Sequence, residues 1–400
     1  MCEMCKKYLI TLDHHKSYDA IFITLHRLEM AYGMELGMLA HLAHLEGEVE
    51  EELLIVNHRI ERRRMRDQCD PFNLPKKLFQ QNFRVSKDIA RGLIERLGPH
   101  FLPTRASALT PTHRVLTALK FFANGSYQRG SVAEHSAINM CQSSVSDSLH
   151  KVIPALLMEL GPEVIKFPQT AAERANVKQG FFQKFGLPGV VGAIDCTLVS
   201  IVPPHLNEEQ FFCRKKCHCI NTQLICDSDL RILNVNVRHG GATNDSFVWA
   251  QSAVFEELWD LVLVQGETYT WLIGDSGYPL QPWLLTPIIN APPDSPQERY
   301  TKAHILARNT IERVNGIMKA KWRCTRKDRR LHYEPAVAKA IIKCCAILHN
   351  IALAAMPDYL DDVVEEPPPL PEPDDDDEPQ DYHDMGLQVR NQLIAARYQH

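Results

Sequence analysis

Three acidic residues have the side-chain types and positions that phosphoryl-transfer chemistry requires. Asp195 ends the apolar run 189–194, Asp275 ends the run 268–274, and Glu312 lies in a stretch expected to be helical. Carboxylates at two strand ends and on one helix can converge on a point where cations must neutralise them. Oxygen ligands favour hard ions such as Mg²⁺ or Mn²⁺. Two such ions about 3.5–4 Å apart can activate a nucleophilic water and stabilise a leaving oxygen.

Basic residues surround Glu312 and are candidates for contact with phosphate groups. Arg308 precedes Glu312 by four residues and Lys319 follows it by seven, so the three side chains share one helix face. A basic stretch follows, whose members could track a nucleic-acid backbone: Lys321, Arg323, Arg326, Lys327, Arg329 and Arg330.

The acids lie in a region, 188–355, that alternates between short apolar runs and longer amphipathic stretches. Strands are expected at 189–195, 220–226, 232–237 and 268–275. Helices are expected at 247–263, 302–321 and 335–355. Strands mixed with helices, with both aspartates at strand ends, predict an α/β or mixed α+β domain.

Two helical regions precede this domain. Residues 1–70 carry a helical pattern from about Tyr18 to Arg66, with leucines spaced near three and four residues. Residues 71–165 read as helix, turn, short helix at 131–136, turn and longer helix, the outline of a helix-turn-helix module. The start of the longer helix, with Ser143 and Ser144, could face DNA. A plain helical bundle packed onto the core is the alternative.

An acidic, proline-rich tail occupies residues 357–400. Between Asp358 and Asp384 there are thirteen acidic residues and no Lys or Arg. Removing these thirteen charges from the net charge of −5 leaves +8 on the rest of the chain. A basic body suits a phosphate-rich partner. We expect the tail to be disordered, because its apolar surface is too small to offset chain ordering.

The twelve cysteines, without a recognisable secretory signal, predict free thiols in a reducing compartment such as the nucleus or cytosol. No apolar run is long enough to predict a transmembrane helix. Cys213, Cys217, His218 and Cys219 lack the paired C-x₂-C spacing of a zinc site, and neighbours in a strand point to opposite faces. Free, partly buried thiols are therefore expected there. Cys196 is expected to be a buried small side chain rather than a nucleophile.

A series of short motifs extends from about Thr112 to Leu353. They are Phe122-Ala-Asn-Gly-Ser126, Gly192-Ala-Ile-Asp-Cys-Thr197, Arg214-Lys215, His218, Ile220-Asn221 with Gln223, Asn244-Asp245-Ser246, Gly274-Asp-Ser-Gly-Tyr-Pro-Leu280, Pro282-Trp-Leu-Leu-Thr-Pro287, Arg308 with Ile311-Glu312-Arg313, and Leu348-His-Asn-Ile351. Together they cover well over half of the chain. In these motifs the chain resembles the Harbinger transposase-derived nucleases of the PIF/Harbinger superfamily, which are DDE superfamily endonucleases.

The resemblance implies an RNase H-like DDE nuclease core, divalent-metal-dependent cleavage of DNA, and a helical DNA-binding region before the core. It assigns catalysis and metal binding to Asp195, Asp275 and Glu312, with Asp245 as a further acid that assists. It also implies residence in the nucleus, with the cytoplasm as a second location, and a Myb-like DNA-binding partner.

The chain departs from the family pattern beside these motifs. Cys217 and Cys219 stand where Gly and Ser are usual, Asn244 replaces a His, and Asn315 replaces a Phe. The three acids are retained. Two functions therefore remain open: a divalent-metal-dependent DNA endonuclease, or a domesticated DNA-binding or adaptor protein with weak or no cleavage activity.

Overall fold

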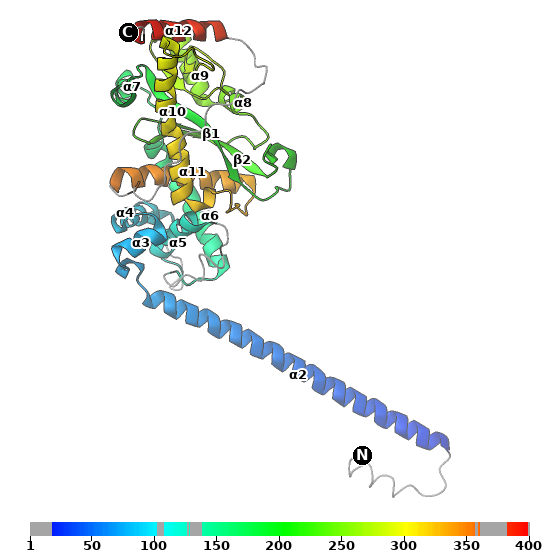
Figure 1. Ribbon diagram of the computed structural model, residues 1–400. Coiled ribbons are helices and arrows are strands. Elements are labelled where there is room, and N and C mark those ends of the chain that lie inside the picture. The colour runs from blue at the N-terminus through cyan, green and yellow to red at the C-terminus, as the bar shows by residue number, and fades with distance from the viewer. Residues whose placement is uncertain are drawn as a thin grey trace. The chain divides into compact units, whose positions relative to one another are not determined.

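The computed structural model describes residues 18–101, 108–125, 128, 138–356, 359–360 and 382–398. The chain divides into two units, Met1–Met65 and Arg66–His400. In its described part the first unit is one helix, α2 (Tyr18–Gln68), which is 51 residues long and whose last three residues are assigned to the second unit (Figure 1). This helix matches the helical pattern expected from Tyr18 to Arg66.

A five-stranded mixed sheet forms the centre of the second unit. Its strands are β1 (Val190–Ser200), β2 (Cys219–Cys226), β3 (Ile232–Asn236), β4 (Trp271–Ile273) and β5 (Leu284–Leu285). The spatial order is β3-β2-β1-β4-β5. The pairs β1–β2 and β2–β3 are antiparallel, whereas β1–β4 and β4–β5 are parallel. The mixed α+β class expected from the sequence is therefore confirmed.

Helices surround this sheet and precede it in the chain. They are α3 (Lys76–Phe83), α4 (Lys87–Leu97), α5 (Pro111–Asn124), α6 (Gln142–Val164), α7 (Ala171–Phe185), α8 (Asp245–Ala250), α9 (Ala253–Trp259), α10 (Pro296–Lys321), α11 (Pro335–Ala355) and α12 (His383–Arg397). The helix expected at 247–263 is split into α8, α9 and a π-helical turn (Asp260–Val264), because Ser252 caps a new helix by accepting the amide of Phe255.

Alternation along β1 divides the interior into two layers. Val190, Ala193 and Val199 join a large core that includes α10 and α11. Val191 and Ile194 face the opposite layer, which contains residues of α8 and α9. Successive side chains of a strand point to opposite faces. Asp195 therefore lies on the α10 side of the sheet, and its neighbour Cys196 lies on the other.

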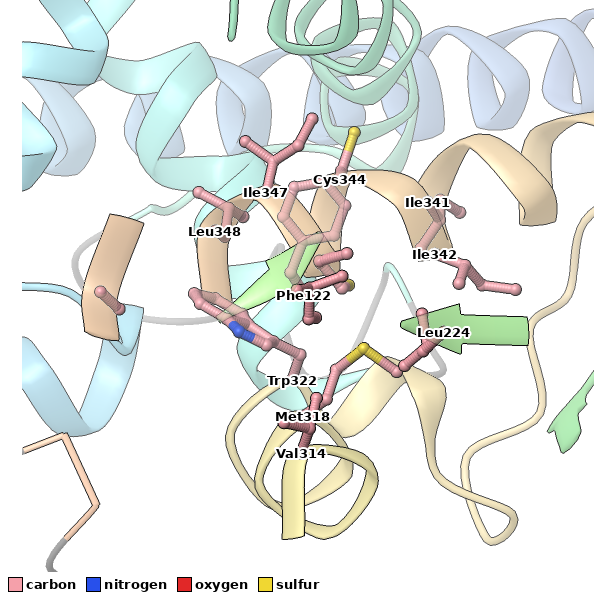
Figure 2. Close-up of a cluster of buried hydrophobic side chains, with 14 of the residues drawn as sticks. Phe122, Leu224, Val314, Met318, Trp322, Ile341, Ile342, Cys344, Ile347 and Leu348 are labelled. Carbon is pink, nitrogen blue, oxygen red and sulfur yellow. The ribbon is translucent and has the colours of Figure 1, made fainter. Parts of the chain in front are cut away.

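The helices before the sheet share its core. Figure 2 shows Phe122 of α5 and Leu224 of β2 near Val314 and Met318 of α10, with α11 residues around them. Helix α6 also packs on both α5 and α11. The expected boundary between a 71–165 domain and a 188–355 domain is therefore wrong, because both stretches contribute side chains to one core within the unit Arg66–His400.

Helix α11 connects the helical layer to the β2–β3 turn. His349 Nε2 lies 2.9 Å from the carbonyl of Leu230, and Asn350 exchanges hydrogen bonds with the backbone N–H and carbonyl of Ile232. Burial lowers the pKa of His349 to about 4, so this imidazole is neutral and structural. Helix α11 is long and apolar enough to span a membrane, but its apolar side chains are mostly buried in the core.

The end of the chain corrects the expectation of a disordered tail over 357–400. Residues 383–397 form α12, where Leu393 and Ile394 are buried and Arg390 donates to the carbonyl of Thr286. Helix α12 packs on α10 and β5. Apolar residues in this last stretch form the buried face of the helix. The acidic residues 361–381 lie outside the described structure, as does the short helix expected at 131–136.

Candidate active site

Parallel pairing of β1 and β4 brings the two aspartates level. Ala193 of β1 pairs with Ile273 of β4, and each aspartate follows two residues later, at Asp195 and Asp275. Asp275 begins the loop after β4, where its Oδ1 accepts the amide of Gly277 at 3.1 Å. The strand-end placement predicted from the sequence holds for Asp275, which follows β4. It does not hold for Asp195, which lies inside β1 because that strand continues to Ser200.

Helix α10 supplies the remaining groups from one face. Arg308 forms a short ion pair with Glu312 one turn later. The same guanidinium lies 3.9 Å from a carboxylate oxygen of Asp195 and 4.0 Å from one of Asp275. Asn315 Nδ2 donates to Asp195 Oδ2 at 2.8 Å. The structure thus gathers the three predicted acids around a single largely buried guanidinium.

The electrostatics of Asp195 reflect this crowding. Burial raises the pKa of Asp195 to about 8, and the negative charges of Asp275, Asp245 and Glu312 act in the same direction. The positive charge of Arg308 opposes them but does not restore an ordinary value. In the absence of a further cation, Asp195 is therefore mostly protonated at neutral pH.

The donor set fits hard divalent cations in kind. The three carboxylates come from β1, the loop after β4 and α10, and the guanidinium of Arg308 lies among them. Asn315 Oδ1, buried beside Asp195, has no hydrogen-bond partner within the described part of the chain. Among the described residues, the three carboxylates do not all come within 4.8 Å of one another, because Arg308 lies between them. Arg308 thus occupies the place where cations would neutralise the acids.

Asp245 occupies a neighbouring position. Asn221 Nδ2 donates to its carboxylate at 2.9 Å and to the carbonyl of Thr243 at the same distance. Asp245 also interacts with Cys196, whose side chain points away from α10. Asp245 lines the same cleft as Asp275, and its charge still raises the pKa of Asp195.

A cleft of about 740 Å³ opens beside these acids. Its walls include Asp245 and Asp275 together with basic side chains from several elements: Arg214, Lys215, Lys319, Lys327 and Arg390. Arg390 and the cleft-lining His383 come from α12, which sequence reasoning placed in the disordered tail. The apolar spacing of Leu387, Leu393 and Ile394 was the available signal for this helix.

The basic residues predicted to contact phosphate differ in where the structure places their side chains. Lys319 lines the cleft and donates to Thr197 Oγ1 at 2.5 Å. Arg323 is exposed. Lys321 is a wrong prediction: it is buried, and its ammonium lies 5.4 Å from the ring centroid of Tyr359. It follows Lys319 by two residues, which turns it about 200° around the helix.

Ser143 and Ser144 lie at the start of α6, where their hydroxyls contact Cys141 Sγ, and neither lines the cleft.

Cys196 behaves as a structural thiol, as the sequence predicted. Burial raises its pKa well above the usual range, and the neighbouring Asp245 adds to this effect. Its sulfur accepts a hydrogen bond from the hydroxyl of Tyr278 at 3.4 Å. The thiolate, which is the nucleophilic form, is therefore disfavoured.

Comparison with known proteins gives consistent matches. The sequence profile of the family described as "DDE superfamily endonuclease" matches residues 194–350. The rat protein named "Putative nuclease HARBI1" is 32% identical over 314 residues, which cover 76% of this chain and 86% of the relative. Its human counterpart is 32% identical over 265 residues, covering 65% and 73%. "Protein ALP1-like" of Arabidopsis thaliana is 25% identical over 304 residues, covering 72% and 73%. No solved structure gives a significant match.

Proposed function

The chain belongs to the Harbinger transposase-derived nucleases, a family of DDE superfamily endonucleases that generally use divalent metals, and we propose that it cleaves DNA phosphodiesters with Mg²⁺ or Mn²⁺. The observation that carries this proposal is the meeting of Asp195, Asp275 and Glu312 around Arg308. A nuclease fold of the RNase H-like type is proposed with it, supported by the sheet order β3-β2-β1-β4-β5 and by the level positions of Asp195 in β1 and Asp275 just after the parallel strand β4.

Asp195, Asp275 and Glu312 would hold the ions in this proposal, with Asp245 at the edge of the site. When bound, divalent ions supply activation of the attacking water and stabilisation of the leaving oxygen. Asp195 must lose its proton to become a ligand, and a nearby cation lowers its pKa enough for this to occur at neutral pH. Arg308 must release part of its contact with the acids, which leaves its guanidinium free to pair with a phosphate.

The cleft supplies the surface for the nucleic acid. Lys319, Lys327 and the adjacent pair Arg214 and Lys215 come from three segments but line one cavity next to Asp275. Lysine and arginine side chains bind the phosphodiester backbone without sequence preference. Lys319 is held by Thr197, so its ammonium is placed before any ligand arrives. The exposed Arg323 extends the basic surface past the end of α10.

A nicking assay tests the proposal. Purified full-length protein would be incubated with supercoiled plasmid and Mg²⁺ or Mn²⁺, beside Asp195→Asn and Glu312→Gln. We expect metal-dependent nicking by the wild type and a loss of at least about a hundredfold in each variant, because each loses a ligand. Asp229→Asn, an exposed acid paired with Lys184, is the matched control and should retain activity. Equal activity in all four proteins would refute the nuclease proposal.

The adaptor alternative predicts a different result in the same samples. A protein that binds DNA, with an affinity that falls as salt rises, but that nicks no plasmid with either ion would be a DNA-binding protein without cleavage. The intact acid cluster and the raised pKa of Asp195 favour the nuclease, since perturbed carboxylates gather at catalytic sites.

Three further proposals follow from the family resemblance and not from the site. We propose residence in the nucleus, contact with DNA through α6 in a helix-turn-helix arrangement, and a Myb-like DNA-binding partner. Imaging of a fluorescent fusion tests the first. A Ser143→Glu, Ser144→Glu variant tests the second, because added negative charge at α6 should weaken DNA binding. Affinity purification from nuclear extract, followed by peptide identification, tests the third.

A further inference from the structure

Three sulfur atoms gather at the start of β2. The Sγ atoms of Cys213, Cys217 and Cys219 all lie within 4.8 Å of one another, and those of Cys213 and Cys217 are 3.4 Å apart. Within the described ranges, this is the only group of three or more Cys, His, Asp or Glu side chains whose ligand atoms come so close. We call it the thiol cluster.

The backbone explains why the three sulfurs meet. The amide of Cys213 donates to the carbonyl of Cys217 at 3.0 Å, and that of Lys216 donates to the carbonyl of Cys213, which closes a tight turn. Lys216 adopts a positive φ of 56° within it. Cys217 and Cys219 are two residues apart in extended chain and so face the same side. The alternation that argued against a metal site in the sequence therefore separates only His218 from the cluster.

His218 has other partners. Its Nε2 lies 2.8 Å from Glu208 Oε1, and its ring centroid lies 5.2 Å from that of Phe212. The thiol cluster is thus a set of three sulfur ligands without the imidazole that sits between them in the sequence.

A second segment closes over the cluster. The amide of Gly241 donates to the carbonyl of Cys219 at 2.8 Å. A Cβ atom at position 241 would lie 2.2 Å from Cys219 Sγ and 3.1 Å from Cys213 Cβ. Only a glycine allows the backbone to approach the sulfurs this closely. Cys213 and Cys219 are consequently buried, while Cys217 remains partly open to the cleft.

We propose that the thiol cluster binds a thiophilic divalent cation, Zn²⁺, through the sulfurs of Cys213, Cys217 and Cys219, with a water molecule from the cleft as the fourth ligand. Zn–S bonds of about 2.3 Å in a tetrahedron place sulfurs about 3.8 Å apart. The Cys213–Cys217 spacing of 3.4 Å is close to that value, and the other two sulfur–sulfur distances are no longer than 4.8 Å. Sulfur donors select zinc over the hard ions that carboxylates prefer.

The charges around the cluster are consistent with bound thiolates. Three thiolates and one divalent ion leave a single negative charge. Arg214, Lys215 and Lys327 line the cleft beside the cluster and carry the opposite charge. Zinc binding therefore releases protons and strengthens as pH rises.

The ion would add metal–sulfur bonds to the backbone hydrogen bonds of this region. It would join the turn 213–217 to the first residue of β2, next to the loop at Gly241. Arg214 and Lys215 sit in that turn and line the cleft. Bound zinc therefore holds two phosphate-binding side chains in place. This role is separate from the hard-ion site and holds whether or not the protein cleaves DNA.

Cobalt substitution tests the proposal on the full-length protein. Reduced, metal-stripped protein would be titrated with Co²⁺, which reports sulfur ligation through thiolate-to-cobalt charge-transfer absorption in the near ultraviolet. We expect one equivalent to bind with these bands and Zn²⁺ to displace it. Cys217→Ser, the least buried of the three, should weaken Zn²⁺ binding by more than about tenfold. Cys141→Ser, an exposed cysteine outside the cluster, is the matched control and should leave binding unchanged.

A second measurement needs no variant. Zn²⁺ should slow alkylation of Cys213, Cys217 and Cys219 by a maleimide, measured peptide by peptide, while Cys141 reacts at an unchanged rate. Absence of charge-transfer bands, or equal bands in Cys217→Ser, would overturn the proposal. Alkylation rates that Zn²⁺ does not change would overturn the proposal as well. A Cys213–Cys217 disulfide that persists in reductant and excludes the ion would also overturn it.

Discussion

Replacing Asp195 by asparagine should stabilise the metal-free protein, and the gain should depend on pH. Burial raises the pKa of Asp195 from 3.8 to about 8. Between these values the folded state binds a proton that the unfolded state releases, so rising pH lowers the stability of the wild type. The side chain is 17% exposed, so solvent screens the penalty little. The introduced amide would resemble the protonated acid and carry no ionisable group.

The size of the effect follows from the same numbers. Each pH unit between the two pKa values corresponds to about 1.4 kcal/mol, so the wild type forfeits about 4 kcal/mol by pH 7 relative to pH 4. This loss should level off above about pH 8, where both states are ionised. The variant should therefore match the wild type near pH 4 and exceed its unfolding free energy by up to about 4 kcal/mol near neutrality.

Urea denaturation in the presence of a chelator, followed by tryptophan fluorescence between pH 4.5 and 8.5, measures this difference. Asp88→Asn, whose parent side chain is 92% exposed, is the control and should give a flat difference. Addition of Mg²⁺ or Mn²⁺ should stabilise the wild type and not Asp195→Asn. A difference that does not change with pH, or a variant less stable than the wild type at pH 7, would refute the account of the acid cluster given above.

Two further substitutions probe the surroundings of the site. Arg308→Gln should destabilise the metal-free protein by about 3 kcal/mol, because it removes the cation among three carboxylates, and Mn²⁺ should restore part of the loss. Thermal unfolding with and without the ion measures both effects, with Arg313→Gln as the control. An Arg308→Gln protein as stable as this control would contradict the prediction. Ile394→Ala should lower the unfolding free energy by about 2–4 kcal/mol, because Ile394 is buried where α12 packs. Replacing the exposed Met385 of the same helix by alanine should have little effect. Equal stability of the two variants would show that α12 is not docked in solution.

The acid site illustrates what local pattern can predict. Asp195 and Asp275 each follow an apolar run, and the parallel register of β1 and β4 places them level. The shared face of Arg308, Glu312 and Lys319 follows from helical spacing alone. The same spacing places Lys321 on a different face of the helix. Its prediction as a phosphate contact considered its charge but not its angle around the helix. The position of Arg308 among the acids could not be predicted, because it depends on how α10 lies across the sheet.

Two other features show why the remaining parts were missed. The tail was predicted to be disordered from its composition of thirteen acids. The short apolar pattern of Leu387, Leu393 and Ile394, which indicates α12, was not considered. The thiol cluster was missed because its cysteines lack C-x₂-C spacing and because neighbours in a strand were expected to face opposite sides. A turn at Lys216 reverses the chain instead, and the close approach of Gly241 completes the enclosure. Both depend on contacts between segments distant in the sequence.

Docking of α12 attaches the acidic segment before it to the folded unit at both ends. Residues 361–381 contain eleven acidic side chains and are joined at both ends to ordered chain. On one side Tyr359 packs against His349, and on the other Tyr382 packs against Trp283, immediately before the cleft-lining His383. A contact of these charges with the basic cleft would be intramolecular, so dilution of the protein would not weaken it. Raised ionic strength would screen such a contact together with contacts to nucleic acid.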